Sequence, residues 1–139
     1  MRVKRMVTTL AAVTAVVAGT ASAATPAAHL SIVIRHQVRG CHSWSVNGGP
    51  FKASQSIALR RGGWITVVDN DMMPHKLVQT GGRAAVLKGV AMSHMGATAT
   101  VRFPAVGVYR FTTKAGEDYM AGVKTTGEDN VLRLTVTVS

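Results

Sequence analysis

The chain has 139 residues, of which 47% are hydrophobic and 5% aromatic, and its formal net charge is +10 at pH 7. This length suits one compact domain with a real core and argues against a second domain. After the first few residues the basic side chains are dispersed, with Arg60-Arg61 as the only adjacent pair, so the basic run needed to track a nucleic-acid backbone is missing. An acidic protein partner or an anionic envelope surface is the more suitable class of partner for such a charge.

The first 23 residues have the three parts of a secretory signal peptide. A basic start containing Arg2, Lys4 and Arg5 precedes an uncharged stretch, and Ala21-Ser22-Ala23 is an A-x-A cleavage signal. Cleavage near Ala23 leaves a short leader, 24–29, and one domain over 30–139, with 13 basic and 6 acidic residues and a net charge of +7. We expect a secreted, periplasmic or cell-envelope protein without a transmembrane segment in its mature chain.

Beyond the leader, alternating apolar residues predict a series of short strands. About seven or eight such strands, with glycine and proline turns between them, indicate an antiparallel β-sandwich or barrel. Gln37–Ser54 and Lys114–Asp129 are expected to be long loops. The predicted strands are Leu30–His36, a strand around Ile57 and Leu59, Trp64–Asp69, His75–Thr80, a short strand within Ala84–Met92, Ala97–Phe103, Tyr109–Thr113 and Leu132–Val138.

Side chains that bind soft metals gather in alternate connections of this predicted fold. If successive strands run up and down, these connections meet at one pole, and His36 reaches it from the end of its strand. Imidazole, thiolate and thioether together define a soft site, and thioether favours copper over zinc, calcium or magnesium. The connections in question hold Cys41-His42, Met73-Pro74-His75, Met92-Ser93-His94-Met95 and Tyr119-Met120.

Each of these side chains also has an ordinary structural interpretation. Cys41 is the only cysteine, which in an exported protein indicates an intermolecular disulfide, a thiol with other chemistry, or a buried small apolar residue. A single methionine is more often a packing residue than a ligand, and a histidine at a strand end is as often hydrogen-bonded as metal-binding. His75 follows Pro74, whose fixed φ makes a rigid corner.

Two segments resemble the cupredoxin family, and the resemblance extends over roughly Leu30 to Ser139. Asp69-Asn70-Asp71-Met72-Met73-Pro74-His75 is similar to the turn that carries the family's first copper histidine, and Gly107–Thr113 is similar to the strand that leads into its ligand loop. The resemblance implies a Greek-key β-sandwich that binds Cu(I) or Cu(II), with His75 as a ligand. The family's later cysteine and histidine are not matched, since Thr113 and Glu117-Asp118 stand at those positions and only Met120 corresponds.

We therefore expect the ligands to be redistributed within the same pole. The predicted metal ligands are Cys41, His42, His75, His94 and Met120, with His36, Met92 and Met95 as further candidates. The expected function is that of an exported copper carrier, copper buffer or electron-transfer protein, with an acidic redox or copper-transfer protein as its candidate partner. A metal-free β-sandwich used for recognition is the alternative. An enzyme is not expected, because nothing orients a histidine as a base for Cys41.

Overall fold

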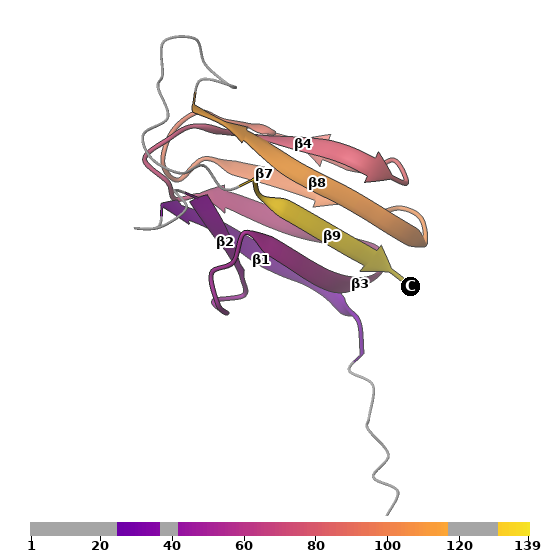
Figure 1. The fold of residues 1–139 in the computed structure, drawn as a ribbon. Coiled ribbons are helices and arrows are strands. Elements are labelled where there is room, and N and C mark those ends of the chain that lie inside the picture. Colours follow the sequence, from indigo (N-terminus) through magenta and orange to yellow (C-terminus); the bar gives the residue numbers. More distant parts are fainter. Residues whose placement is uncertain (1–24, 37–41, 117–130) are drawn as a thin grey trace, which may run out of the picture.

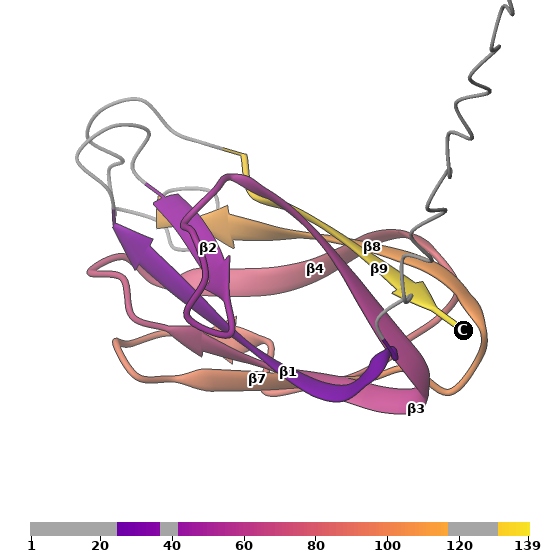
Figure 2. The same cartoon turned by 90° about the horizontal axis from the view of Figure 1, so that it is seen from below.

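The computed structural model describes residues 25–36, 42–116 and 131–139. Its strands form one curled sheet in which β4, β8 and β9 lie over β1, β2 and β7 (Figures 1 and 2). The all-β fold expected from the sequence is confirmed, and within these ranges no helix has the length and apolar character of a membrane span. The strands are β1 (Ala27–His36), β2 (His42–Val46), β3 (Ser54–Asp69), β4 (His75–Gly82), β5 (Val86–Lys88), β6 (Ala91–Met92), β7 (Thr98–Arg102), β8 (Gly107–Ala115) and β9 (Arg133–Val138).

The sheet is mixed, whereas the sequence predicted antiparallel pairing throughout. Its strand order is β2-β1-β3-β9-β8-β4-β6, and β7 pairs with both β3 and β5. The β1–β3 and β3–β9 pairs are parallel, and the other named pairs are antiparallel. Alternation of apolar and polar residues reports which face of a strand is buried, but it carries no information on the direction of the neighbouring strand.

Gly62 and Gly63 bend β3 where the sequence predicted a turn between two separate strands. The Ser54–Leu59 half pairs with β9, and the Trp64–Asp69 half pairs with β1 and β7. Gly62 has a φ of +76°, and a Cβ on Gly63 would lie 2.8 Å from the carbonyl oxygen of Arg60. Both positions therefore need glycine, and the bend lets one strand contribute to both layers (Figure 2).

Strand β2 lies within the connection that the sequence predicted to be irregular. It pairs with β1 in antiparallel register, with Ile34 opposite Trp44 and His36 opposite His42. Trp44 is fully buried, and its Nε1 donates to the carbonyl oxygen of Ala53 at 3.1 Å. The alternating pattern misses this strand because serines occupy two of its five positions.

The core fills the space between the layers and ends at the pole where β1 and β8 end and β2 and β4 begin. We call this end the histidine pole. The aromatic part of the core is tightly packed, with the Phe103 ring centroid 4.9 Å from that of Tyr109 and 6.0 Å from that of Phe111. The largest fully buried side chains include Ile32, Ile34, Trp44, Leu59, Ile65, Phe103, Tyr109, Leu132 and Leu134.

Candidate metal centre

Three of the predicted histidines converge at the histidine pole. His36 ends β1, His42 begins β2 directly opposite it, and His75 begins β4. The ring centroids of His42 and His75 are 4.7 Å apart with the planes nearly perpendicular, and those of His36 and His42 are 6.5 Å apart. His42 and His75 are buried, whereas the side chain of His36 is 44% exposed. The structure thus brings together side chains from three strands, with an opening to solvent at His36.

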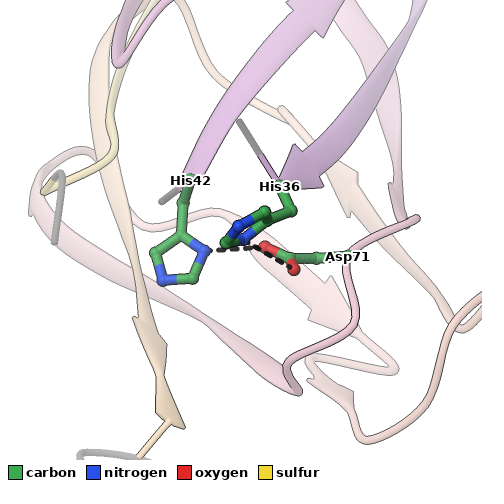
Figure 3. A group of neighbouring side chains, drawn as sticks. All are labelled: His36, His42 and Asp71. Carbon is green, nitrogen blue, oxygen red and sulfur yellow. Dashed lines mark hydrogen bonds and ion pairs between the residues drawn. The ribbon is translucent and has the colours of Figure 1, made fainter. Parts of the chain in front are cut away.

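The three imidazoles face the carboxylate of Asp71, a residue that the sequence indicates only as part of a turn. Asp71 Oδ2 lies 2.6 Å from His42 Nδ1 and 3.0 Å from His75 Nε2. Its Oδ1 lies 3.9 Å from His36 Nδ1, and Figure 3 shows the rings of His36 and His42 directed toward this carboxylate. Asp71 and His75 are four residues apart across Pro74, a spacing that is compatible with this contact but did not predict it.

A second buried carboxylate, that of Asp69, shapes the loop that presents Asp71. Asp69 Oδ1 accepts a hydrogen bond from the Asp71 backbone N–H at 3.0 Å, and its Oδ2 accepts one from the His75 backbone N–H at 3.2 Å. Asp71 in turn accepts one from the Met73 backbone N–H at 3.2 Å. Such carboxylate-to-backbone bonds, together with the fixed φ of Pro74, define a rigid connection between β3 and β4.

The pKa values of these two carboxyl groups are shifted in opposite directions. Burial raises the pKa of Asp69, and the hydrogen bond from the Asp71 backbone with the charge of His75 only partly offsets it. Burial also acts to raise the pKa of Asp71, but the hydrogen bonds from His42, His75 and the Met73 backbone outweigh it and hold that pKa well below its ordinary value. Asp71 is therefore an ionised, buried carboxylate flanked by imidazoles.

Thr113 fixes the other side of the His75 ring. Its Oγ1 lies 3.0 Å from His75 Nδ1, and Ala115 two residues later is the cross-strand partner of His75. Thr113 therefore points inward, toward the histidine pole. Because the Thr113 hydroxyl forms a hydrogen bond with His75 Nδ1, the Nε2 atom of His75 is directed at Asp71.

The other predicted ligands lie in different surroundings. Met92 is buried and is the cross-strand partner of His75 in the β4–β6 pair. His94 is exposed, with its Nδ1 3.1 Å from the Met95 carbonyl oxygen, and Met95 itself is 57% exposed. No contact among the described residues joins His94 or Met95 to the Asp71 cluster. Cys41 and Met120 lie outside the residues that the structure describes.

Three side chains at the pole, His36, His42 and Asp71, each place one donor atom close enough to the others to hold a metal ion. In a tetrahedral site with metal–nitrogen and metal–oxygen bonds of about 2.0 to 2.1 Å, ligand atoms lie about 3.3 Å apart. The Asp71 oxygens lie 2.6 Å from His42, 3.0 Å from His75 and 3.9 Å from His36, and one ligand atom from each of His36, His42 and Asp71 lies within 4.8 Å of the others. A metal ion would take the place of the protons that the imidazoles share with the carboxylate. The residues therefore fit an ion that accepts imidazole and carboxylate donors.

Comparisons with known proteins give distant structural likenesses only. No family model matches the chain, and no curated protein matches it either. The fold is similar to a mutant of amicyanin with Cu(I), at 12% identity and a TM-score of 0.42, over 78% of this chain and 82% of that one. It is also similar to rusticyanin variants, at 12% identity and a TM-score of 0.42 over 83% and 80% of the two chains. A multicopper oxidase is similar at 17% identity and a TM-score of 0.44, where 80% of this chain covers 41% of the oxidase. At these identities and TM-scores, the chemistry of the histidine pole follows from its own residues.

Proposed function

We propose that this chain is an exported copper-binding protein that holds its metal at the histidine pole. His42, His75 and Asp71 are the inner donors, and His36 is the exposed one. The observation that carries the proposal is the convergence of two buried imidazoles, from two different strands, on one buried ionised carboxylate. A buried charge is costly unless it is paired, and a bound cation would provide the pairing.

Copper is favoured over zinc by a thioether beside this cluster and by a thiol next to His42 in the sequence. Cys41 precedes His42 in the sequence, and Met92 is buried opposite His75. Imidazole and carboxylate suit Cu(II), whereas thiolate and thioether suit Cu(I), so the chain has donors for both oxidation states. The resemblance of the turn ending in His75 to the cupredoxin turn supports the same ion.

The surroundings of the donors support binding and transfer of copper rather than catalysis. Thr113 orients His75, and the Asp69 bonds hold the loop that presents Asp71. The half-exposed His36 gives an ion a route between solvent and the buried donors. Bound copper would supply a one-electron redox couple, but an open donor suits a copper carrier or buffer best.

Metal analysis of protein purified without a tag, followed by competition titration with a copper chelator, tests the proposal. We expect about one copper ion per chain, and loss of more than about 100-fold in affinity in the double variant His42→Gln, His75→Gln, since even residues that only orient a ligand are worth 10- to 100-fold. His29→Gln is the matched control. His29 lies near the start of β1, stacks on Trp64 and contacts Thr66, so its loss should leave copper affinity unchanged.

Two results would contradict the proposal. If the double variant binds copper as tightly as the wild type, the pole is a structural hydrogen-bond cluster and the metal-free recognition module becomes the better description. If zinc displaces copper at equal concentration, the thiol and thioether donors play no part in selecting the metal.

A further inference from the structure

The outward surface of the layer formed by β4, β8 and β9 carries a set of basic side chains. Leu77, Phe111 and Leu134 point into the core, so their sequence neighbours point to solvent. Four of these outward residues are exposed and positively charged. We call them the basic face: Lys76 on β4, Arg110 and Lys114 on β8, and Arg133 on β9.

The register places these charges next to one another. Lys76 lies directly opposite Lys114 in the β4–β8 pair. Arg110 lies opposite Thr135, two residues beyond Arg133, so the two arginines are diagonal neighbours on one surface. Like charges directly opposite each other destabilise a sheet.

No acidic side chain among the described residues offsets this repulsion. The only ion pairs in the described ranges join histidines to Asp71 at the histidine pole. Within residues 25–36, 42–116 and 131–139, the basic face therefore carries positive charge over three adjacent strands with no acidic side chain paired to it. A negatively charged partner would be attracted to this face, and its binding would also reduce the repulsion between the basic side chains of the sheet.

A groove of about 460 Å³ lies between the two arginines. Guanidinium groups bind carboxylates with two parallel hydrogen bonds, and threonine hydroxyls add further donors. Thr112 donates to the Leu132 carbonyl oxygen at 2.7 Å, and Thr80 and Thr135 are the other two threonines in the lining of the groove. The side chains that line the groove include Arg110, Arg133, Thr80, Thr112, Thr135 and Val131.

We propose that the basic face is a docking surface for an acidic segment of a partner protein. One aspartate or glutamate carboxylate enters the groove between Arg110 and Arg133, and further carboxylates lie against Lys76 and Lys114. A protein fits better than a small anion, because Arg110 and Lys114 are four residues apart on β8, or about 13 Å along the strand. A single small anion cannot span that distance.

One end of the basic face lies next to the candidate metal centre. Lys76 follows His75 in the sequence, and Lys114 precedes Ala115, the cross-strand partner of His75. The lysine end of the basic face therefore borders the histidine pole. A partner seated on all four cations would lie beside the candidate metal centre, although its binding does not require a bound metal.

Fluorescence anisotropy on the metal-free exported chain tests the proposal, with a labelled peptide of alternating glutamate and serine as the probe and the matching glutamine peptide as the uncharged probe. The double variant Arg110→Gln, Arg133→Gln should weaken binding of the acidic peptide by at least about tenfold, since it removes the charge-assisted hydrogen bonds from both guanidinium groups. The matched control is Lys88→Gln, Arg102→Gln, which removes two charges from the outward surface of β5 and β7. The control should lose less than about threefold, because it changes only screened long-range attraction.

A second double variant tests the repulsion between Lys76 and Lys114. Lys76→Gln, Lys114→Gln should weaken peptide binding and also raise the melting temperature of the free protein, because it removes the opposed charges. Equal losses of affinity in the arginine variant and in its control would overturn the proposal, leaving only the general attraction of a basic protein.

Two further outcomes would also overturn the proposal. Displacement of the peptide by an equal concentration of glutarate would assign the groove to small dicarboxylates. Tighter binding to phosphatidylglycerol vesicles than to the peptide, through the same arginines, would assign the face to a membrane surface. Because the protein is metal-free in all these titrations, they can fail while the copper proposal holds, and the reverse is also true.

Discussion

The buried imidazoles of His42 and His75 both form hydrogen bonds with the carboxylate of Asp71. This shared partner holds the two rings together at the histidine pole. The sequence indicated the histidines because imidazole is a familiar metal ligand at a strand end. It did not indicate Asp71, since an aspartate after Asp69-Asn70 is explained by turn formation alone. Only the fold shows that this turn residue is buried and faces His42, which is distant in the sequence.

The depressed pKa of Asp71 predicts an acid-labile contribution to stability. An unfolded aspartate takes up a proton near pH 3.9, whereas the folded group stays ionised to lower pH. This stabilisation is complete above the unfolded pKa and is lost as the pH falls below about 4. The melting temperature of the metal-free wild type should therefore fall toward that of Asp71→Asn between about pH 5 and pH 2. A difference between the two proteins that stays constant over this range would contradict the prediction.

His75 belongs to the core, whereas the sequence indicated only that it lies where a turn meets the start of a strand. It is the first residue of β4, is fully buried, and makes contacts through both ring nitrogens. We expect His75→Ala to lower the free energy of unfolding of the metal-free protein by about 1 to 3 kcal/mol, because it leaves buried partners unsatisfied. Urea unfolding in the presence of a chelator measures this change. His36→Ala, at a half-exposed position of the same cluster, should cost less than about 1 kcal/mol, and equal costs would show that His75 has no special structural role.

Strands were predicted well wherever one apolar residue alternated with one polar residue. The segment Ala84–Met92, in which one short strand was predicted, contains the two short strands β5 and β6. Strand β2 was missed because the polar residues Ser43 and Ser45 are buried in it. The continuity of β3 was missed because a glycine pair can bend a strand as well as end one. These errors have a common cause, since the partners of a strand are fixed by the rest of the fold rather than by its own residues.

Phe111 tests the packing between the layers. It is 2% exposed and packs against Phe103, with 6.0 Å between the ring centroids. Phe111→Ala should lower the free energy of unfolding by about 3 to 5 kcal/mol through lost burial and the cavity left behind. Arg110→Ala, on the outward surface next to it, should change stability by less than about 0.5 kcal/mol in the same urea titration. A similar small change in both variants would mean that β8 does not pack in the register described.

The bulge at the end of β4 gives a matched pair of glycine substitutions. Gly82 has a φ of +83°, and a Cβ there would collide with the Val108 carbonyl oxygen, whereas nothing lies within 4 Å of a Cβ on Gly81. Gly82→Ala should therefore lower the free energy of unfolding by more than about 1 to 2 kcal/mol, the cost of a left-handed conformation alone. Gly81→Ala should be nearly neutral in thermal unfolding. The reverse order would contradict the register of β4 and β8 at this end.

At the scale of the whole molecule, the fold creates features that the linear sequence disperses. The alternation of strand directions was enough to predict that His36, His42 and His75 share one pole, and the structure gathers them there. The positive charges looked evenly spread along the chain, yet strand pairing aligns four of them on one surface. Which residues share a pole follows from the alternation of strand directions along the chain, which the sequence predicted. Which residues lie side by side depends on the pairing register, which the sequence did not predict.

The most direct test of the copper proposal is pulsed electron paramagnetic resonance of the Cu(II)-loaded protein, which detects the imidazole nitrogens bound to the ion. We predict signals from at least two histidines in the wild type, loss of one in His42→Gln and of another in His75→Gln, and an unchanged spectrum in His94→Gln. Spectra of His42→Gln and His75→Gln that are identical to the wild-type spectrum would show that copper, if bound, lies elsewhere, and would contradict the assignment of the histidine pole as the metal centre.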